Sequence, residues 1–416
     1  MNKSEIARFV FQEFLDMYKK RGYSDIQNEL LKVSSITAKK YNDFHTAIDF
    51  LDRRYNHLQS NVSHKKAKSI LFRTNYGVKF SSIILETKKH YLTKLIVSGK
   101  IDRLFALKNF MGYICDSDLH QFVYSYLTKM DEKYLCALIT KIEEKLRDEK
   151  PDYIVFHGDN NPITRAIVFV CKKLKITTID IQHGIYQTTA LMDGRIADYV
   201  LVWGQYFRDM YLNQGVKKHE QIYILGYPYP IEKKVKKKHI SGKRHVVYYL
   251  GQNFEKYNEE LINIKLETIK ALNDTCSKLG LKFVYRPHPG DDRNLLKSKR
   301  PEVKFVSGGE KLEYSFRKGD IFISFNSTAL IEAAMRSKIC LQLMNYPIQS
   351  DNFEKLGIVT KSFENIKDLE QYLVIISRSK KLGDFQTKFN NKYIDISHNP
   401  GNLFLEILGD LEKKKK

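Results

Sequence analysis

The spacing of apolar residues changes along the chain. In the first part they recur every three or four positions, as in "EIARFVFQEFLDMY" (residues 5–18) and "YNDFHTAIDFLDRRY" (residues 41–55). This is the period of an amphipathic helix, so we expect residues 1–64 to form a helical extension. From residue 65 onward, short apolar runs alternate with segments of helical period. Such alternation is typical of βαβ units, in which helices cover a parallel sheet.

Strand-like runs occur in two groups separated by one basic segment. The first group is "KSILFRT", "DYIVFHGD", "ITTIDIQHG", "DYVLVWG" and "QIYILGYP", and residues 81–95 ("SSIILETKKHYLTKL") are predicted as a helix within it. The second group is "HVVYYLGQ", "LKFVYRPHPG", "PEVKFVSG", "DIFISFNS" and "ICLQLMNY". Between the groups, residues 231–244 carry a run of charges that is typical of a linker.

The sequence therefore predicts an α/β protein with two Rossmann-like, doubly wound domains. The expected parts are a helical extension (1–64), an N-terminal acceptor domain (65–230), a basic linker (231–244), a C-terminal nucleotide-donor domain (245–380), and final helices with a basic tail (381–416). Two such domains in series are expected to face a cleft. Ligands of open α/β sheets bind at the carboxyl ends of the strands.

The composition is that of a globular protein large enough for two cores, with 416 residues of which 43% are hydrophobic and 28% charged. Five scattered cysteines without a Cys-x-x-Cys pair predict reduced thiols rather than a disulfide framework. The first residues, "MNKSEIARFVFQEF", include acids and lack the apolar core of a signal peptide. No apolar run of about 18 residues is present. We therefore expect a cytoplasmic protein.

The net charge of +22 predicts an anionic partner. Lysines outnumber arginines about three to one, which fits diffuse charge better than base recognition, so no specific nucleic acid is expected. The densest clusters are residues 232–244 and the tail 412–416. These clusters could rest on an anionic membrane surface, at the inner face of the cytoplasmic membrane, or be a solvated linker and tail.

Polar residues gather where two strands of the first domain end. "HGDN" (His157–Asn160) and "QHG" (Gln182–Gly184) each follow an apolar strand. Asp159 and His183 are candidates for a general base, because transfer of a group to a hydroxyl requires removal of its proton. Asp159 could instead cap the following helix, and His183 could be a hydrogen-bonded structural residue. The other acceptor-side candidates are His157, Asn160 and Gln182.

Two strand ends of the second domain carry residues suited to a phosphate. In "RPHPG", Arg286 offers bidentate contacts, and His288, held between prolines, can donate to a phosphate or protonate a leaving group. In "SFNSTALIEAA", Ser327 and Thr328 open a helix, where N–H groups and the dipole attract phosphate, although an ordinary N-cap is the alternative. Glu332 lies one turn later and could accept hydrogen bonds from a ribose. The predicted nucleotide-binding residues are Arg286, His288, Pro289, Asn326, Ser327, Thr328 and Glu332.

No metal and no bound cofactor are expected. The sequence contains neither a DxD pair flanked by strands nor His and Cys residues at ligand spacing. Protein cations and N–H groups would then balance the charge of a nucleotide substrate.

Through these motifs, residues 65–380 resemble the GT-B glycosyltransferases that build bacterial capsules and lipopolysaccharides. They are most similar to the branch of sialyltransferases, Kdo transferases and teichoic-acid-type glycerophosphate polymerases. The shared motifs are an HP pair, here His288-Pro289, and a Ser/Thr pair, here Ser327-Thr328. The resemblance implies that the histidine contacts the nucleotide phosphate and aids its departure. It also implies that the Ser/Thr pair holds this phosphate and that Glu332 contacts the ribose.

The resemblance leaves two candidates for the base. "QHG" is similar to a strand-end HG of the glycerophosphate polymerases, where the histidine is the expected base, and this favours His183. The sialyltransferases carry an acidic motif instead, to which only "HGD" with Asp159 is comparable.

The expected function is metal-independent, inverting transfer from a nucleotide-activated sugar, such as CMP-linked sialic acid or Kdo. The acceptor would be an anionic saccharide or a lipid-linked precursor of a bacterial surface polysaccharide, in capsule or lipopolysaccharide. Three different functions stay open: a CDP-polyol phosphotransferase of teichoic-acid type, a nucleotide-sugar epimerase of the same fold, and a non-catalytic basic protein that binds polysaccharide or nucleic acid. The sequence does not predict the oligomeric state.

Overall fold

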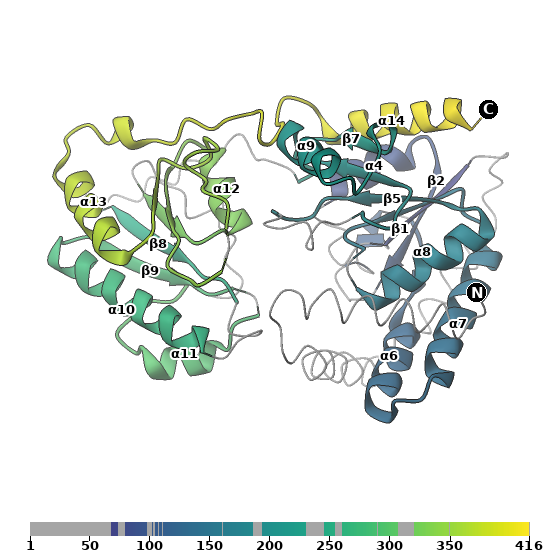
Figure 1. Ribbon diagram of the computed structural model, residues 1–416, viewed down its shortest axis with the longest axis horizontal. Coiled ribbons are helices and arrows are strands. Elements are labelled where there is room, and N and C mark those ends of the chain that lie inside the picture. Colours follow the sequence, from purple (N-terminus) through teal and green to yellow (C-terminus); the bar gives the residue numbers. More distant parts are fainter. Residues whose placement is uncertain are drawn as a thin grey trace. The chain divides into compact units, whose positions relative to one another are not determined.

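The computed structural model describes residues 68–73, 80–97, 102, 105–106, 108–109, 111–159, 161–185, 194–229, 245–253, 260–288, 290–306, 320–348 and 350–415. They divide into two compact units, each built on a parallel sheet (Figure 1). Unit 1 comprises Met1–His183, Thr189–Pro230 and Ile394–Lys416, and unit 2 comprises Gly184–Thr188 and Ile231–Tyr393. The predicted extension (1–64) and linker (231–244) lie outside the described residues.

Seven parallel strands form the sheet of unit 1, in the order β3-β2-β1-β4-β5-β6-β7. Their bounds are β1 Ser69–Arg73, β2 Leu92–Val97, β3 Gly112–Cys115, β4 Tyr153–Phe156, β5 Thr177–Ile181, β6 Tyr199–Val202 and β7 Ile222–Ile224. The runs predicted as strands at β1, β4, β5, β6 and β7 are confirmed. Every residue of β4 and β5 is buried. β4 is apolar without alternation, as expected of a strand covered on both faces, whereas β5 also buries Thr177, Thr178 and Asp180.

The predicted helix over residues 81–95 is wrong in its second half. Helix α4 spans Ser81–Lys88, and β2 begins at Leu92 after an exposed turn. The apolar residues of β2 continue the helical spacing of α4, so the period alone does not separate the two elements. The β-branched residues Thr93 and Ile96 favour the strand that forms. Strand β3 was not predicted at all.

Helices cover both faces of the unit 1 sheet. Their bounds are α6 Ser117–Lys129, α7 Lys133–Glu149, α8 Pro162–Leu174, α9 Gln205–Asn213 and α14 Pro400–Lys414. The apolar faces of α6, α7 and α8 pack with Leu71 of β1. On the other face α14, yellow in Figure 1, lies beside α4, and the ring of Phe404 is 5.9 Å from that of Phe72. The C-terminal helix therefore completes unit 1, although the chain reaches it only after unit 2.

Five parallel strands form the sheet of unit 2, in the order β12-β11-β10-β8-β9. The elements are β8 Val246–Leu250, α10 Leu261–Lys278, β9 Lys282–Arg286, α11 Arg293–Lys299, β10 Ile321–Ser324, α12 Thr328–Ala334, β11 Ile339–Leu343, β12 Lys361–Phe363 and α13 Ile366–Arg378. Residues of α10, α11 and α13 share one core with all five strands. The strand predicted at "PEVKFVSG" is reduced to a single bridge between Phe305 and Tyr285.

Each sheet has one point at which the order of its strands reverses. In unit 1, β1 lies between β2 and β4, and in unit 2, β8 lies between β9 and β10. At such a switch point the flanking connections diverge, and ligands of open α/β sheets bind there, at the carboxyl ends of the strands. The loops that follow β4, β5, β9 and β10 carry the candidate residues, so the fold places them at the carboxyl edges of the two sheets.

Candidate functional site

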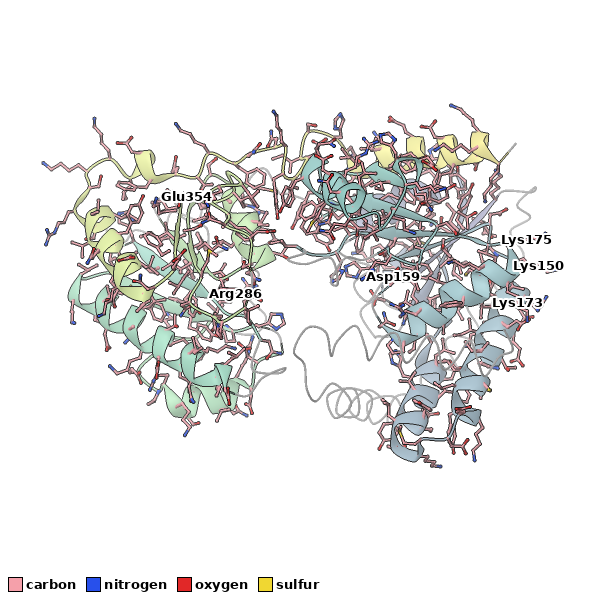
Figure 2. The ribbon with its side chains drawn as sticks, viewed as in Figure 1. Lys150, Asp159, Lys173, Lys175, Arg286 and Glu354 are labelled. Atoms are coloured by element: carbon pink, nitrogen blue, oxygen red, sulfur yellow. The ribbon has the colours of Figure 1, made fainter. Side chains whose placement is uncertain are left out.

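Arg286, labelled in Figure 2, ends β9. His288 follows it at the carboxyl edge of the unit 2 sheet. The carbonyl of Arg286 accepts a hydrogen bond of 2.9 Å from the N–H of Gly251, which ties the ends of β8 and β9 together. His288 is exposed, and its backbone N–H donates to Oδ2 of Asp291 at 2.8 Å. Pro289, the third predicted residue of this motif, lies outside the described residues. A well-anchored backbone therefore presents the guanidinium and the imidazole.

The imidazole of His288 is oriented by its own loop. The N–H of Gly290 donates to Nδ1 of His288 at 3.1 Å. Because Nδ1 acts as the acceptor, the neutral ring carries its proton on Nε2. His288 thus presents an N–H donor, which is the form suited to hydrogen-bond a phosphate oxygen.

Two residues after β8 belong to the same edge, and the sequence patterns did not single them out. A Cβ atom on Gly251 would lie 2.2 Å from the hydroxyl of Tyr285, so the chain passes too close for any side chain there. A Cβ atom on Gly290 would lie 2.4 Å from Nδ2 of Asn253 and 3.4 Å from Nδ1 of His288. The Asn253 amide therefore lies against the His288 loop. The sequence "GQN" directly after a predicted strand could have indicated these residues, because the other candidate clusters were also found as polar residues after a strand.

Asn326 and Ser327 lie between β10 and α12, and Thr328 is the first residue of α12. Asn326 is almost fully buried, whereas the two hydroxyl residues are half-buried. Ser327 is the N-cap of α12, and its Oγ accepts a hydrogen bond of 3.2 Å from the N–H of Ala329. Ser327 therefore caps α12, as the alternative interpretation of its sequence position predicted. Since α12 has only seven residues, its dipole adds little to any attraction for an anion.

Strand pairing brings three loops of unit 2 together. β8 pairs in parallel with both β9 and β10, so their carboxyl ends lie at one edge of the sheet. This edge carries Arg286, His288 and Asn326, and Glu332 is half-buried one turn into α12. A guanidinium, an imidazole N–H and nearby hydroxyls make this edge chemically suited to an anion such as a phosphate.

His157 and His183 follow the neighbouring strands β4 and β5 of unit 1. Their rings meet edge to face, with centroids 4.8 Å apart. Tyr229, which the sequence patterns did not indicate, donates its hydroxyl proton to the carbonyl of His183 at 3.0 Å and lies 3.3 Å from Nε2 of His157. The Tyr229 oxygen then accepts from His157, which places the proton of that ring on Nε2. His183 is exposed and His157 half-buried, so His183 is the more accessible of the two.

Asp159, labelled in Figure 2, is fully buried. Its side chain is 0% exposed, and its two oxygens accept hydrogen bonds of 2.9 Å from the backbone N–H groups of Gly194 and Ile196. The following helix, α8, is capped by Asn161. Asp159 therefore holds a loop in place without capping α8. Asn160 lies outside the described residues.

Gln182 is also buried and supports the backbone beneath His183. Its Oε1 accepts a hydrogen bond of 2.8 Å from the N–H of Trp203, and its carbonyl accepts one of 2.7 Å from the indole Nε1–H. The Trp203 ring packs against Tyr227 and Tyr229. This aromatic cluster fixes the end of β5, and with it the position from which His183 extends.

Across the described residues, no group of three or more His, Cys, Asp or Glu side chains is arranged to hold a metal ion. The helices in this part of the chain include none that is long and apolar enough to cross a membrane.

Comparison with known proteins identifies the fold. No protein-family model matches the chain, and no curated relative does. The UDP-N-acetylglucosamine 2-epimerase of Rickettsia bellii matches with a TM-score of 0.57 at 15% identity, over 83% of this chain and 96% of that one. The Methanocaldococcus jannaschii UDP-GlcNAc 2-epimerase, in complex with UDP-GlcNAc and UDP, matches with a TM-score of 0.55 at 16% identity, over 82% of this chain and 99% of that one. A glycosyltransferase of Rickettsia africae matches with a TM-score of 0.53 at 11% identity, over 84% of this chain and 99% of that one.

The chain has the GT-B fold. Both parallel-sheet domains of that fold are present, which confirms the fold class predicted from the sequence. At identities of 11–16% the likeness is one of fold. In the GT-B chain, the residues singled out from the sequence follow β4 and β5 of unit 1, and β9 and β10 of unit 2.

Proposed function

We propose that this chain is a GT-B glycosyltransferase whose unit 2 binds a nucleotide-activated sugar and whose unit 1 activates the acceptor hydroxyl. The observation that carries the proposal is the end of β9, where Arg286 and the N–H donor His288 adjoin the switch point of the unit 2 sheet. The GT-B fold, shared with the Rickettsia africae glycosyltransferase, supports it.

In the proposed reaction the acceptor oxygen attacks the anomeric carbon of the sugar, and the bond from that carbon to the nucleotide phosphate breaks. Negative charge then develops on the departing phosphate. Arg286 and the Nε2–H of His288 stabilise this charge, with Thr328 and Asn326 as further donors at the same edge. Because these groups are already oriented, the stabilisation requires little reorganisation during the reaction. Attack opposite the leaving group inverts the anomeric centre.

We assign the general base to His183. A base must meet its substrate, and His183 is exposed, whereas Asp159 is buried with both oxygens bound to backbone N–H groups. His183 would take the proton of the acceptor hydroxyl as the new glycosidic bond forms. Tyr229 and Gln182 hold the backbone that carries it.

The donor we propose is a CMP-activated acidic sugar, and the acceptor an anionic saccharide or lipid-linked precursor of a bacterial surface polysaccharide. The donor follows from the HP and Ser/Thr motifs, and the acceptor from the net charge of +22. The same charge would suit a cytoplasmic protein that associates with the inner face of the membrane. We propose that no metal is needed, so activity should persist in EDTA.

Nucleotide binding can be tested by thermal denaturation with CMP, CDP, UDP, GDP and ADP. A ligand of the folded state at one hundred times its Kd stabilises by about 2.7 kcal/mol, which raises the melting temperature measurably. We expect CMP to stabilise the wild type and not His288→Ala. His90→Ala, which removes an exposed histidine of unit 1, is the control and should respond like the wild type. Absence of a shift with every nucleotide would refute the donor site.

A nucleotide-sugar epimerase is the second candidate, because two UDP-GlcNAc 2-epimerases share the fold at TM-scores of 0.57 and 0.55. Epimerisation needs no acceptor, whereas glycosyl transfer does. Incubation with UDP-GlcNAc in D2O would therefore distinguish them by NMR. Deuterium at C2 of the sugar without an acceptor would support the epimerase, and stabilisation by UDP alone would agree with it.

A CDP-polyol phosphotransferase and a non-catalytic binding protein would each give a distinct result. The phosphotransferase would transfer a polyol phosphate and release CMP, so mass spectrometry of the product would reveal phosphorus in the new linkage. The binding protein would retain its binding after loss of His183 and His288, with an affinity that falls steeply as salt increases.

A further inference from the structure

A charged pair lies buried beneath the His288 loop. Lys265, in the second turn of α10, and Asp291, just after the loop, have side chains that are both 0% exposed, and their charged atoms are 3.0 Å apart. Lys265 occupies a position of the apolar face of α10, together with Leu261, Ile269 and Leu272. A lysine in such a position loses its hydration, so its charge requires a partner of fixed geometry.

Asp291 serves three donors at once. Oδ1 accepts from the ammonium of Lys265, and Oδ2 accepts from the hydroxyl of Tyr285 at 3.0 Å and from the backbone N–H of His288 at 2.8 Å. Burial, followed by the nearby Asp291 charge, raises the pKa of Tyr285, which keeps its hydroxyl protonated as a donor. Two of the three donors come from the protein core, and the third is the residue that we place at the phosphate.

The backbone of this loop also sets the ring. The N–H of His288 is held by Asp291, and two residues later the N–H of Gly290 donates to Nδ1 of the same histidine. The Asn253 amide fills the space beside Gly290. A shift of the loop would therefore break the contact to Nδ1 and release the ring to either neutral tautomer.

We infer that Asp291, anchored by Lys265 and Tyr285, is a positioning residue that fixes His288 with Nε2–H directed to the phosphate of the bound nucleotide. The inference rests on the proposed function for the identity of the ligand. Buried charge pairs stabilise a fold no better than apolar residues of similar size, so stability alone does not account for a lysine at this core position.

Two sets of substitutions separate the hydrogen-bond acceptor from the charge. Lys265→Met with Asp291→Asn removes both charges and leaves an amide oxygen that can accept from Tyr285 and His288. Lys265→Met with Tyr285→Phe and Asp291→Leu replaces the whole network by apolar groups, which avoids an unpaired buried charge. Asp274→Asn is the matched control, since Lys270 and Asp274 form a pair of the same type on α10, 2.6 Å apart and exposed.

Two measurements test whether the His288 ring is held in place. Nitrogen-15 NMR of labelled protein distinguishes the two neutral histidine tautomers, and the His288 signal is assigned by its loss in His288→Ala. Calorimetry gives the affinity for CMP. We expect the acceptor-retaining variant and Asp274→Asn to keep the Nε2–H tautomer and to bind CMP within about twofold of the wild type. In the apolar variant we expect mixed tautomers and CMP binding weakened roughly tenfold, at a similar melting temperature.

The inference is overturned if the apolar variant folds and keeps both the tautomer and the affinity of the wild type. If the apolar variant does not fold, Tyr285→Phe decides, because unchanged tautomer and affinity in this variant would overturn the inference that its hydroxyl anchors Asp291. Failure of the wild type to bind CMP or any other nucleotide would count against the proposed function instead, and the tautomer would still report on the network.

Discussion

The polar side chains at the strand ends differ in their burial and in their hydrogen-bond partners within the protein. Asp159 accepts two backbone N–H groups inside unit 1, while His183, at the end of the neighbouring strand, extends to the surface. The donors to Asp159 come from Gly194 and Ile196, at least 35 residues further along the chain. Nothing in the sequence near Asp159 indicates these hydrogen bonds. The sequence alone therefore could not decide whether Asp159 or His183 is the better candidate for the general base.

We expect the two residues to fail in different ways when they are substituted. His183→Ala should lower kcat by about 10²- to 10⁴-fold with little change in melting temperature, because it removes an exposed base. Asp159→Asn should destabilise the protein by about 1–3 kcal/mol, because its amide nitrogen cannot accept from a buried N–H. Chemical denaturation and steady-state kinetics on both variants test this.

His157→Ala is the control for His183→Ala, since it alters the neighbouring ring without removing the proposed base. A kcat loss confined to Asp159→Asn, in protein that is still fully folded, would return the base to Asp159.

Most strands of both sheets were predictable, including β7 and β9 at sheet edges, whereas β2 and β3 of unit 1 were not. β4 is buried and apolar throughout, so it produces a continuous apolar run that ends at a polar loop. β2 carries the exposed Leu92 and the half-buried Lys94, and its apolar positions merge with those of α4. β3 has only four residues. A partly solvated strand such as β2 lacks the continuous apolar run on which the prediction depends.

Helix α14 stabilises unit 1 through its buried face, which includes Phe404 at 0% exposure against α4 and Phe72. Phe404→Ala should destabilise unit 1 by about 3–5 kcal/mol, because it leaves a cavity as well as losing apolar contact. Lys413→Ala, on the exposed face of the same helix, should change stability by less than about 0.5 kcal/mol.

The stability of both α14 variants is measured by urea denaturation followed through Trp203, which lies in unit 1. Equal effects of the two α14 substitutions on this transition would mean that the helix does not contribute to the stability of the unit.

The whole molecule combines two parallel-sheet units with a net charge of +22. The division into two α/β units, and their order along the chain, could be anticipated from the two groups of apolar runs. The return of the last helix to unit 1 could not, because an amphipathic helix fits either sheet equally well by its pattern. The chain crosses from one unit to the other between Tyr393 and Ile394.

The charge of the whole molecule should appear in the salt dependence of acceptor binding. Screening lengths shorten from about 10 Å at 0.1 M salt to about 3 Å at 1 M, so attraction between a basic surface and a polyanion weakens. We expect the KM for an anionic saccharide acceptor to rise steeply over this range. The KM for a neutral acceptor of the same length should change little, and equal slopes for the two acceptors would contradict an electrostatic role.

The place of α14 has a consequence for synthesis on the ribosome. Unit 1 begins to emerge first, but the helix that covers one face of its sheet is translated only after all of Ile231–Tyr393. At elongation rates of about 5–20 residues per second this delay is roughly 10 to 30 s. During that interval α14 is not yet available to pack against Phe72 and α4, while the segments of unit 2 are being made. The nascent chain is therefore expected to need a chaperone at unit 1 and to complete its second unit before its first.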